Sequence, residues 1–91
     1  MLPKKYRLEK HRIPEVARKG KRTYFKSFEM RFLKNEKMEN PKICVIVSKK
    51  VSKKATERNR LKRKLRAWAW EQIKNGALPL GEYVLVGKGL T

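Results

Sequence analysis

Residues 42–70 read KICVIVSKKVSKKATERNRLKRKLRAWAW, a buried strand followed by a long basic helix. The first part, residues 42–48, is an almost continuous apolar run rich in β-branched side chains, which predicts a central strand covered on both faces. From about Ser52 the spacing of apolar residues becomes helical, and Asn75 and Gly76 mark the helix end. A helix of this span is about 30 Å long.

One side of this helix is apolar and the remainder is basic. At 100° per residue, a single stripe faces the sheet and is made of Leu61, Leu65, Trp68 and Ala69. The other positions carry the charge, because ten Lys or Arg stand between Lys49 and Arg66 with Glu57 as the one acid among them. The stripe therefore predicts the contact with the core, and the cations predict the solvent faces.

The rest of the chain supplies a short helix and two more strands. Residues 13–20 predict one or two helical turns, and residues 23–33 alternate like a half-buried strand that pairs antiparallel with residues 42–48. Residues 82–87 form another strand of the buried type. We therefore expect one α+β domain over residues 1–91, a small two-layer sandwich of a mixed sheet and a long basic helix.

Composition indicates a polyanionic partner. The chain has 26 Lys or Arg against 8 Asp or Glu, a net charge of +18, so it repels itself unless an anion is near. Nucleic acid is the first candidate and an anionic membrane surface the second, but no apolar helix face is left free for a membrane. A single cysteine, no signal peptide and no long apolar run favour a soluble, cytoplasmic protein.

The helix carries like charges at the spacing where helices usually pair opposite ones. Arg58, Lys62 and Arg66 stand four residues apart, and each such like-charged pair destabilises a helix by a few tenths of a kcal/mol. Mixed Arg and Lys on one rigid surface suit phosphate oxygens. Since no helix-turn-helix, zinc-finger or zipper pattern is present, structured RNA is preferred to DNA.

The candidate binding residues fall into two groups. Phosphate contacts are expected from the strand end and the helix, through Lys49, Lys50, Lys53, Lys54, Arg58, Asn59, Arg60, Lys62, Arg63 and Arg66. A cleft for single-stranded RNA is expected from Arg31, Tyr24, Tyr83 and Trp70. For Trp70 two roles stay open, stacking on an exposed base or covering the loop near Leu78 and Leu80.

Nothing in the sequence predicts chemistry by the protein alone. His11 stands alone in a basic segment, Cys44 lies in a buried strand, and the acids show no paired spacing for acid and base catalysis or for two metals. We therefore expect no catalytic and no metal-ligating residue, and no cofactor bound by the protein itself.

The central block resembles the signature of the bacterial ribonuclease P protein subunit. Ser48, Lys49 and Lys50 match that family's strand end, and its basic helix positions are matched by Arg58, Asn59, Arg60, Lys62, Arg63 and Arg66. The resemblance implies a fold like the second domain of ribosomal protein S5, with a left-handed strand, helix, strand crossover. It also implies a ribonucleoprotein that removes the 5′ leader of precursor tRNA.

In that family the RNA subunit holds the catalytic Mg²⁺ ions, and the protein binds this RNA with its helix and the leader with its sheet cleft. The resemblance therefore implies ribonuclease P RNA and precursor tRNA as partners, with no membrane and no obligate protein partner. Two departures stand out: Ile13 and Ala17 occupy positions where the family has leader-contacting aromatics, and the usual C-terminal helix is missing. The alternatives are a structural RNA-binding protein of ribosomal type with no role in catalysis, and a DNA-compacting protein.

Overall fold

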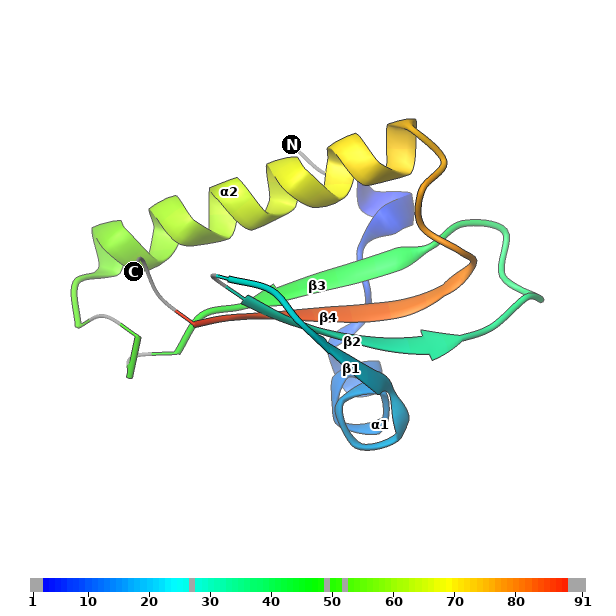
Figure 1. The fold of residues 1–91 in the computed structure, drawn as a ribbon, viewed down its shortest axis with the longest axis horizontal. Helices are drawn as coiled ribbons and strands as arrows, with labels where there is room; N and C mark the ends of the chain where they lie inside the picture. Colours follow the sequence, from blue (N-terminus) through cyan, green and yellow to red (C-terminus); the bar gives the residue numbers. More distant parts are fainter. Residues whose placement is uncertain (1–2, 27, 49, 52, 89–91) are drawn as a thin grey trace.

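The computed structural model describes residues 3–26, 28–48, 50–51 and 53–88. Two short 3-10 turns precede the other elements (Figure 1). The elements in chain order are η1 Lys4–Tyr6, η2 Lys10–Arg12, α1 Ile13–Lys19, β1 Lys21–Tyr24, β2 Phe28–Lys34, β3 Lys42–Ile46, α2 Ala55–Lys74 and β4 Gly81–Gly87.

A four-stranded mixed sheet in the order β1-β2-β4-β3 is covered by one helix on each face. β2 is antiparallel to β1 and β4, whereas β3 and β4 are parallel. Helix α2 packs over β3 and β4, and α1 packs on the opposite face against β2 and β4 (Figure 1). The α+β prediction is confirmed.

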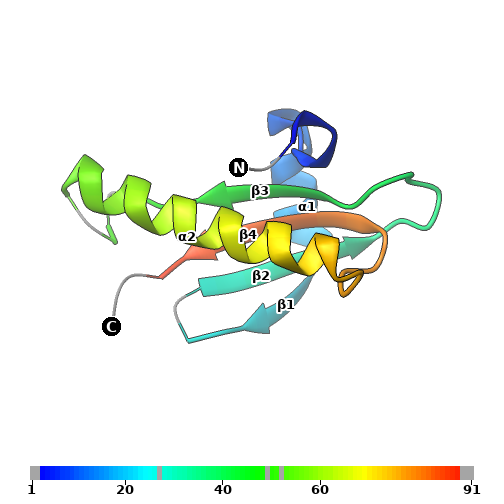
Figure 2. The same cartoon turned by 90° about the horizontal axis from the view of Figure 1, so that it is seen from above.

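The connection from β3 through α2 to β4 has the rare hand. Seen from the helix side with the two strands pointing upward, β4 lies to the left of β3 (Figure 2). This is a left-handed crossover, whereas about 98% of such connections are right-handed. The resemblance implied this hand, and strand spacing alone predicts the opposite one.

Three predictions about the sheet are wrong. β3 is an edge strand, and β4 lies between it and β2, so β2 and β3 do not pair. Both apolar runs look like central strands, and the sequence pattern does not show which one lies in the middle. The predicted strand 23–33 is a hairpin, in which the amide of Phe25 donates to the carbonyl of Phe28 at 2.8 Å.

The predicted stripe of α2 forms the main core contact. Leu61, Leu65 and Ala69 are buried, and Trp68 is half-buried with its ring 5.0 Å from that of Phe28. The helix begins at Ala55 and ends as predicted. It ends there because Gly76 adopts a φ of 67°, a left-handed conformation that closes a helix and that glycine adopts without strain.

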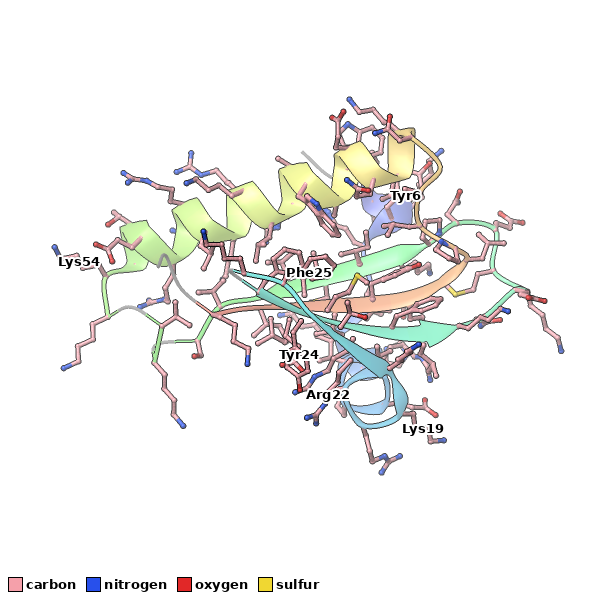
Figure 3. The ribbon with its side chains drawn as sticks, in the orientation of Figure 1. Tyr6, Lys19, Arg22, Tyr24, Phe25 and Lys54 are labelled. Carbon is pink, nitrogen blue, oxygen red and sulfur yellow. The ribbon has the colours of Figure 1, made fainter. Side chains whose placement is uncertain are left out.

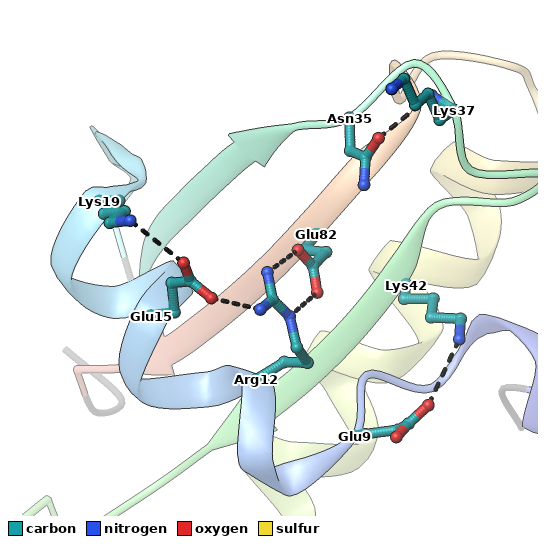
Figure 4. A network of polar contacts seen from close by, with 8 residues as sticks. All are labelled: Glu9, Arg12, Glu15, Lys19, Asn35, Lys37, Lys42 and Glu82. Atoms are coloured by element: carbon teal, nitrogen blue, oxygen red, sulfur yellow. Dashed lines mark hydrogen bonds and ion pairs between the residues drawn. The ribbon is translucent and has the colours of Figure 1, made fainter.

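An ion-pair network fastens α1 to the sheet (Figure 4). Arg12 donates from Nε and Nη2 to the two carboxylate oxygens of Glu82, both at 2.7 Å. Glu15 accepts hydrogen bonds from Lys19 at 3.2 Å and from Arg12, and these two cations lower the pKa of its carboxyl. Because Glu82 is 5% exposed, the bidentate partner is what makes its burial tolerable.

The N-terminal segment, residues 3–12, runs past the outer edge of β3. Arg7 forms a parallel bridge with Ile43, and the amide of Leu8 donates to the carbonyl of Ile43 at 3.0 Å. On the α2 side, the ring of Tyr6 lies 5.5 Å from that of Trp70. Trp70 is half-buried and packs against the main core, so the structure supports a packing role for it.

Replacing Trp70 tests this packing role. We expect Trp70→Ala to lower the free energy of unfolding by about 1 to 3 kcal/mol, because Tyr6 and the core edge lose their partner. RNA affinity of the folded variant should stay unchanged. Urea unfolding and filter binding measure the two quantities, with Glu71→Ala as an exposed neighbouring control. Lost affinity at unchanged stability would instead show that Trp70 stacks on RNA.

The tyrosine in β4, Tyr83, makes the stability of the fold decrease at alkaline pH. Tyr83 is 1% exposed, and burial raises its pKa to about 12 from an ordinary value of about 10. Its hydroxyl donates to the carbonyl of Pro79 at 2.6 Å. A raised pKa means that the folded state keeps the proton longer than the unfolded chain does. The stability that Tyr83 contributes is therefore complete below about pH 10 and is lost as pH rises through about 12.

We expect the free energy of unfolding to fall over this interval more steeply in the parent protein than in Tyr83→Phe. Urea titrations at a series of pH values measure the difference. Tyr24→Phe is the matched control, since it removes the hydroxyl of a tyrosine that is 67% exposed, and it should follow the parent curve. Parallel curves for the parent and Tyr83→Phe would contradict the assignment.

Candidate nucleic-acid interface

The solvent side of α2 is a cationic surface. Its side chains project away from the sheet because the apolar stripe fixes the rotation of the helix (Figure 3). We name this surface the helix face and define it by Asn59, Arg60, Lys62, Arg63, Lys64 and Arg66. All of these residues are exposed except Lys62, which is half-exposed. Arg58 was also predicted to bind RNA, but it lies three residues before Leu61, on the side of the apolar stripe, where it is half-exposed.

Acids neutralise little of the helix face. Among the described residues, no ion pair is formed by the cations Arg60, Lys62, Arg63, Lys64 and Arg66. Arg58 and Glu57, in contrast, do have interaction partners. The ion pair between Lys74 and Glu71, at 3.8 Å, lies in the last turn of α2. Most of the helix face therefore keeps its charge for an external anion.

The loop between β3 and α2 carries further cations. Lys50, Lys53 and Lys54 are exposed, and Lys54 directly precedes the first turn of α2 (Figure 3). Of these three predicted residues, the structure therefore places Lys54 at the start of α2, and Lys50 and Lys53 in the loop that leads to it. Lys49 was predicted to bind RNA as well, and it lies outside the described residues.

On the other side of the sheet, the strand register gathers a second group. Tyr24 stands opposite Glu29, and Arg22 stands opposite Arg31, so all four side chains share the face on which α1 packs. Tyr24 is 67% exposed, and the ammonium of Lys88 lies 5.8 Å from its ring centroid. We name Arg22, Tyr24, Glu29, Arg31 and Lys88 the sheet cluster.

A buried carboxylate organises the sheet cluster. Glu29 is 4% exposed and has three cations near it: Arg31 at 3.4 Å, and Arg22 and Lys88 both at 3.6 Å. Arg31 also donates to the carbonyl of Ala17 at 3.1 Å, which ties it to α1. Glu29 thus interacts with three cations beside the exposed ring of Tyr24. The sheet cluster keeps two positive charges in excess, which attract anions.

Two of the four residues predicted for a cleft are placed elsewhere. Tyr83 pairs with Phe32 in the ladder and stacks on its ring at 4.6 Å, so it lies in the core beneath α2 and cannot reach RNA. Trp70 lies on α2, on the opposite side of the sheet from Tyr24 and Arg31. Arg22 and Lys88 were missed, because residues 21–24 were not predicted as a separate strand and Lys88 follows the last predicted strand.

The described residues offer little for chemistry of their own. Among them, no group of three or more His, Cys, Asp or Glu could hold a metal ion. His11 pairs with Glu9 at 3.4 Å, and burial raises the pKa of the Cys44 thiol. No helix in the described part of the chain is long and apolar enough to cross a membrane. What the arrangement can do is bind a polyanion on two surfaces.

Known proteins resemble this chain in sequence and in fold. The chain matches the Ribonuclease P family over residues 2–89. It is 43% identical over 67 residues to the ribonuclease P protein component of Synechocystis sp., a match that covers 72% of this chain and 54% of that protein. The chain therefore spans about half the length of this curated relative.

The solved structures agree. The RNase P protein of Thermotoga maritima is 30% identical with a TM-score of 0.73, over 89% of this chain and 72% of that one. A Staphylococcus aureus RNase P protein mutant is 20% identical with a TM-score of 0.78, over 90% of this chain and 68% of that one, and shows the same fold. The family match over residues 2–89 and the fold shared with the Thermotoga maritima protein show that the chain belongs to the ribonuclease P protein family.

Proposed function

We propose that this chain is the protein subunit of a bacterial ribonuclease P, the ribonucleoprotein that removes the 5′ leader of precursor tRNA. The observation that carries the proposal is the helix face on a domain of the ribonuclease P protein family: its cations from Arg60 to Arg66 form no ion pair among the described residues. In this role the helix face binds the catalytic RNA and the sheet cluster binds the leader. Residues 1–91 act as one RNA-binding domain.

The helix face is suited to a folded RNA. Arg58, Asn59 and Arg60 lie in the first two turns of α2, and the exposed Lys54 directly precedes the helix. Arginine forms two parallel hydrogen bonds with a phosphate, and lysine acts as a mobile point charge. Because the apolar stripe holds α2 on the sheet, these groups are positioned before RNA arrives, which limits the entropy lost on binding.

The sheet cluster is suited to a single strand. The exposed ring of Tyr24 offers a stacking surface for a base, and Arg22 and Lys88 offer charge to the neighbouring phosphates. Glu29 keeps these cations in place without neutralising them fully. Ile13 and Ala17 of α1 provide no aromatic ring here, so stacking on the leader depends on Tyr24.

The chain assists hydrolysis by holding RNA strands and does not perform it. The Mg²⁺ ions that supply the hydrolytic chemistry belong to the RNA subunit of the holoenzyme. The cations of this protein reduce the repulsion between the catalytic RNA and its tRNA substrate, as Mg²⁺ also does. The protein should therefore matter most when Mg²⁺ is scarce.

A processing assay tests the proposal. Added to a bacterial ribonuclease P RNA transcript at low Mg²⁺, the protein should accelerate removal of the 5′ leader from a precursor tRNA, and the acceleration should shrink as Mg²⁺ rises. Gel separation of the released leader gives the rate. Lysozyme, another small basic protein, is the control for charge alone. Tight RNA binding with no acceleration at any Mg²⁺ concentration would favour a structural RNA-binding protein instead.

A single arginine of the helix face gives a sharper measurement. Arg63→Ala should weaken binding to the catalytic RNA and lower the slope of log K against log salt by about 0.7 to 0.9, since one phosphate contact and its counterion release are lost. Arg18→Ala removes the same charge from the exposed surface of α1 and should leave the slope nearly unchanged. Equal slopes for all three proteins, each verified as folded, would rule out the phosphate contact of Arg63.

A further inference from the structure

A groove follows the outer edge of β3, away from both surfaces described above. Its walls come from Leu8 and Lys10 of the N-terminal segment, Cys44 and Val45 of β3, and Arg66 of α2. The volume is about 340 Å³, near the lower end of the range for small-ligand pockets, which is about 300 to 1,000 Å³. Because β3 and β1 form opposite edges of the sheet, this groove is separate from the sheet cluster.

The path of the N-terminal segment creates the groove. Leu8 pairs with Ile43 through one backbone hydrogen bond, and from Lys10 the chain turns into η2 and leaves the strand. Backbone N–H and C=O groups alternate in direction along a strand, so those of Val45 point to the same side of β3 as those of Ile43, the side on which Leu8 lies. An edge strand therefore presents backbone donors and acceptors to the groove, beside the apolar side chains of Leu8 and Val45.

Cations from two elements converge on the groove. Lys10, Lys62 and Arg66 all stabilise the thiolate form of Cys44 electrostatically, although burial outweighs them and raises the pKa of the thiol. None of these three cations has an ion-pair partner among the described residues. Glu9, the nearest acid in sequence to Lys10, interacts with His11 at 3.4 Å and Lys42 at 3.7 Å. The groove therefore combines uncompensated positive charge with an apolar floor.

We propose that this groove holds one nucleotide of the ribonuclease P RNA, with its phosphate between Lys10 and Arg66 and its sugar or base against Leu8 and Val45. The inference rests on the proposed function and extends its RNA surface around the edge of the sheet. Arg66 belongs to both the helix face and the groove, so a strand bound on α2 leads directly into it. A second copy of the chain, with its charge of +18, is repelled from the same edge.

The one cysteine of the chain reports on the groove. Alkylation of Cys44 by N-ethylmaleimide is measured for the protein alone, with a saturating bacterial ribonuclease P RNA transcript, and with inorganic phosphate. We expect the RNA to slow alkylation several-fold and phosphate at millimolar concentration to leave it unchanged. Full protection by phosphate alone would show that the groove binds a small anion and not a nucleotide. Protection that grows with protein concentration without RNA would show a second copy in the groove, and both results overturn the proposal.

Matched variants separate the groove from the helix face. Lys10→Ala should restore much of the alkylation in the presence of RNA and lower the salt slope by about 0.7 to 0.9, as expected for one lost phosphate contact. Lys37→Ala, an equal change of charge in the β2–β3 loop, should do neither. Both positions are exposed, so both variants should fold, which circular dichroism verifies.

The failure of this inference can be told from that of the proposed function. If the protein binds the RNA and accelerates leader removal while Cys44 is alkylated at the same rate as in the free protein, the groove is empty in the complex. The inference is then wrong and the proposed function is not. The same holds if Lys10→Ala and Lys37→Ala behave alike. If the ribonuclease P RNA neither binds nor is assisted, the proposed function falls together with the groove.

Discussion

The contact between the apolar stripe of α2 and the sheet is what the rest of the structure depends on. Leu61, Leu65 and Ala69 are buried there, and a fully buried leucine contributes about 2 kcal/mol through burial. The same helix carries like charges four residues apart, each pair opposing it by a few tenths of a kcal/mol. Burial of the stripe therefore outweighs the repulsion, and α2 stays helical although most of its cations have no acidic partner in the described part of the chain.

The few acids of the chain are distributed accordingly. Glu29 and Glu82 are buried on the α1 side of the sheet, where each holds arginine in place, and Glu15 pairs with cations of the same region. Because these acids pair with cations on the α1 side of the sheet, they do not neutralise the cations of α2. The molecule thus combines an ion-paired region on the α1 side of the sheet with a helix on which most of the described cations form no ion pair.

Much of the fold follows from local patterns, and the errors share one cause. The period of α2, its end at Gly76 and its buried stripe were all predictable, because they depend on neighbours within a few residues. The position of β3 at an edge was not, since two apolar strands of similar composition can exchange places without changing their patterns. The hairpin containing β1 was missed because its exposed residues, Lys21–Tyr24, carry no alternation of burial.

The candidate site divides in the same way. The basic residues of α2 and of its preceding loop could be named from the sequence, since a cation that lies off the apolar stripe of a helix must face solvent. The aromatic residues could not be assigned, because strand register decides which face each one takes. Tyr83 faces α2 and is buried, whereas Tyr24 faces the other way and is exposed.

Composition and helical periodicity alone were enough to predict the excess of positive charge and the side of α2 that carries most of it. The edge position of β3, the burial of Tyr83 and the convergence of cations distant in the chain became visible in the folded structure alone. Those features depend on contacts between segments far apart in sequence, and such contacts leave no local pattern to read.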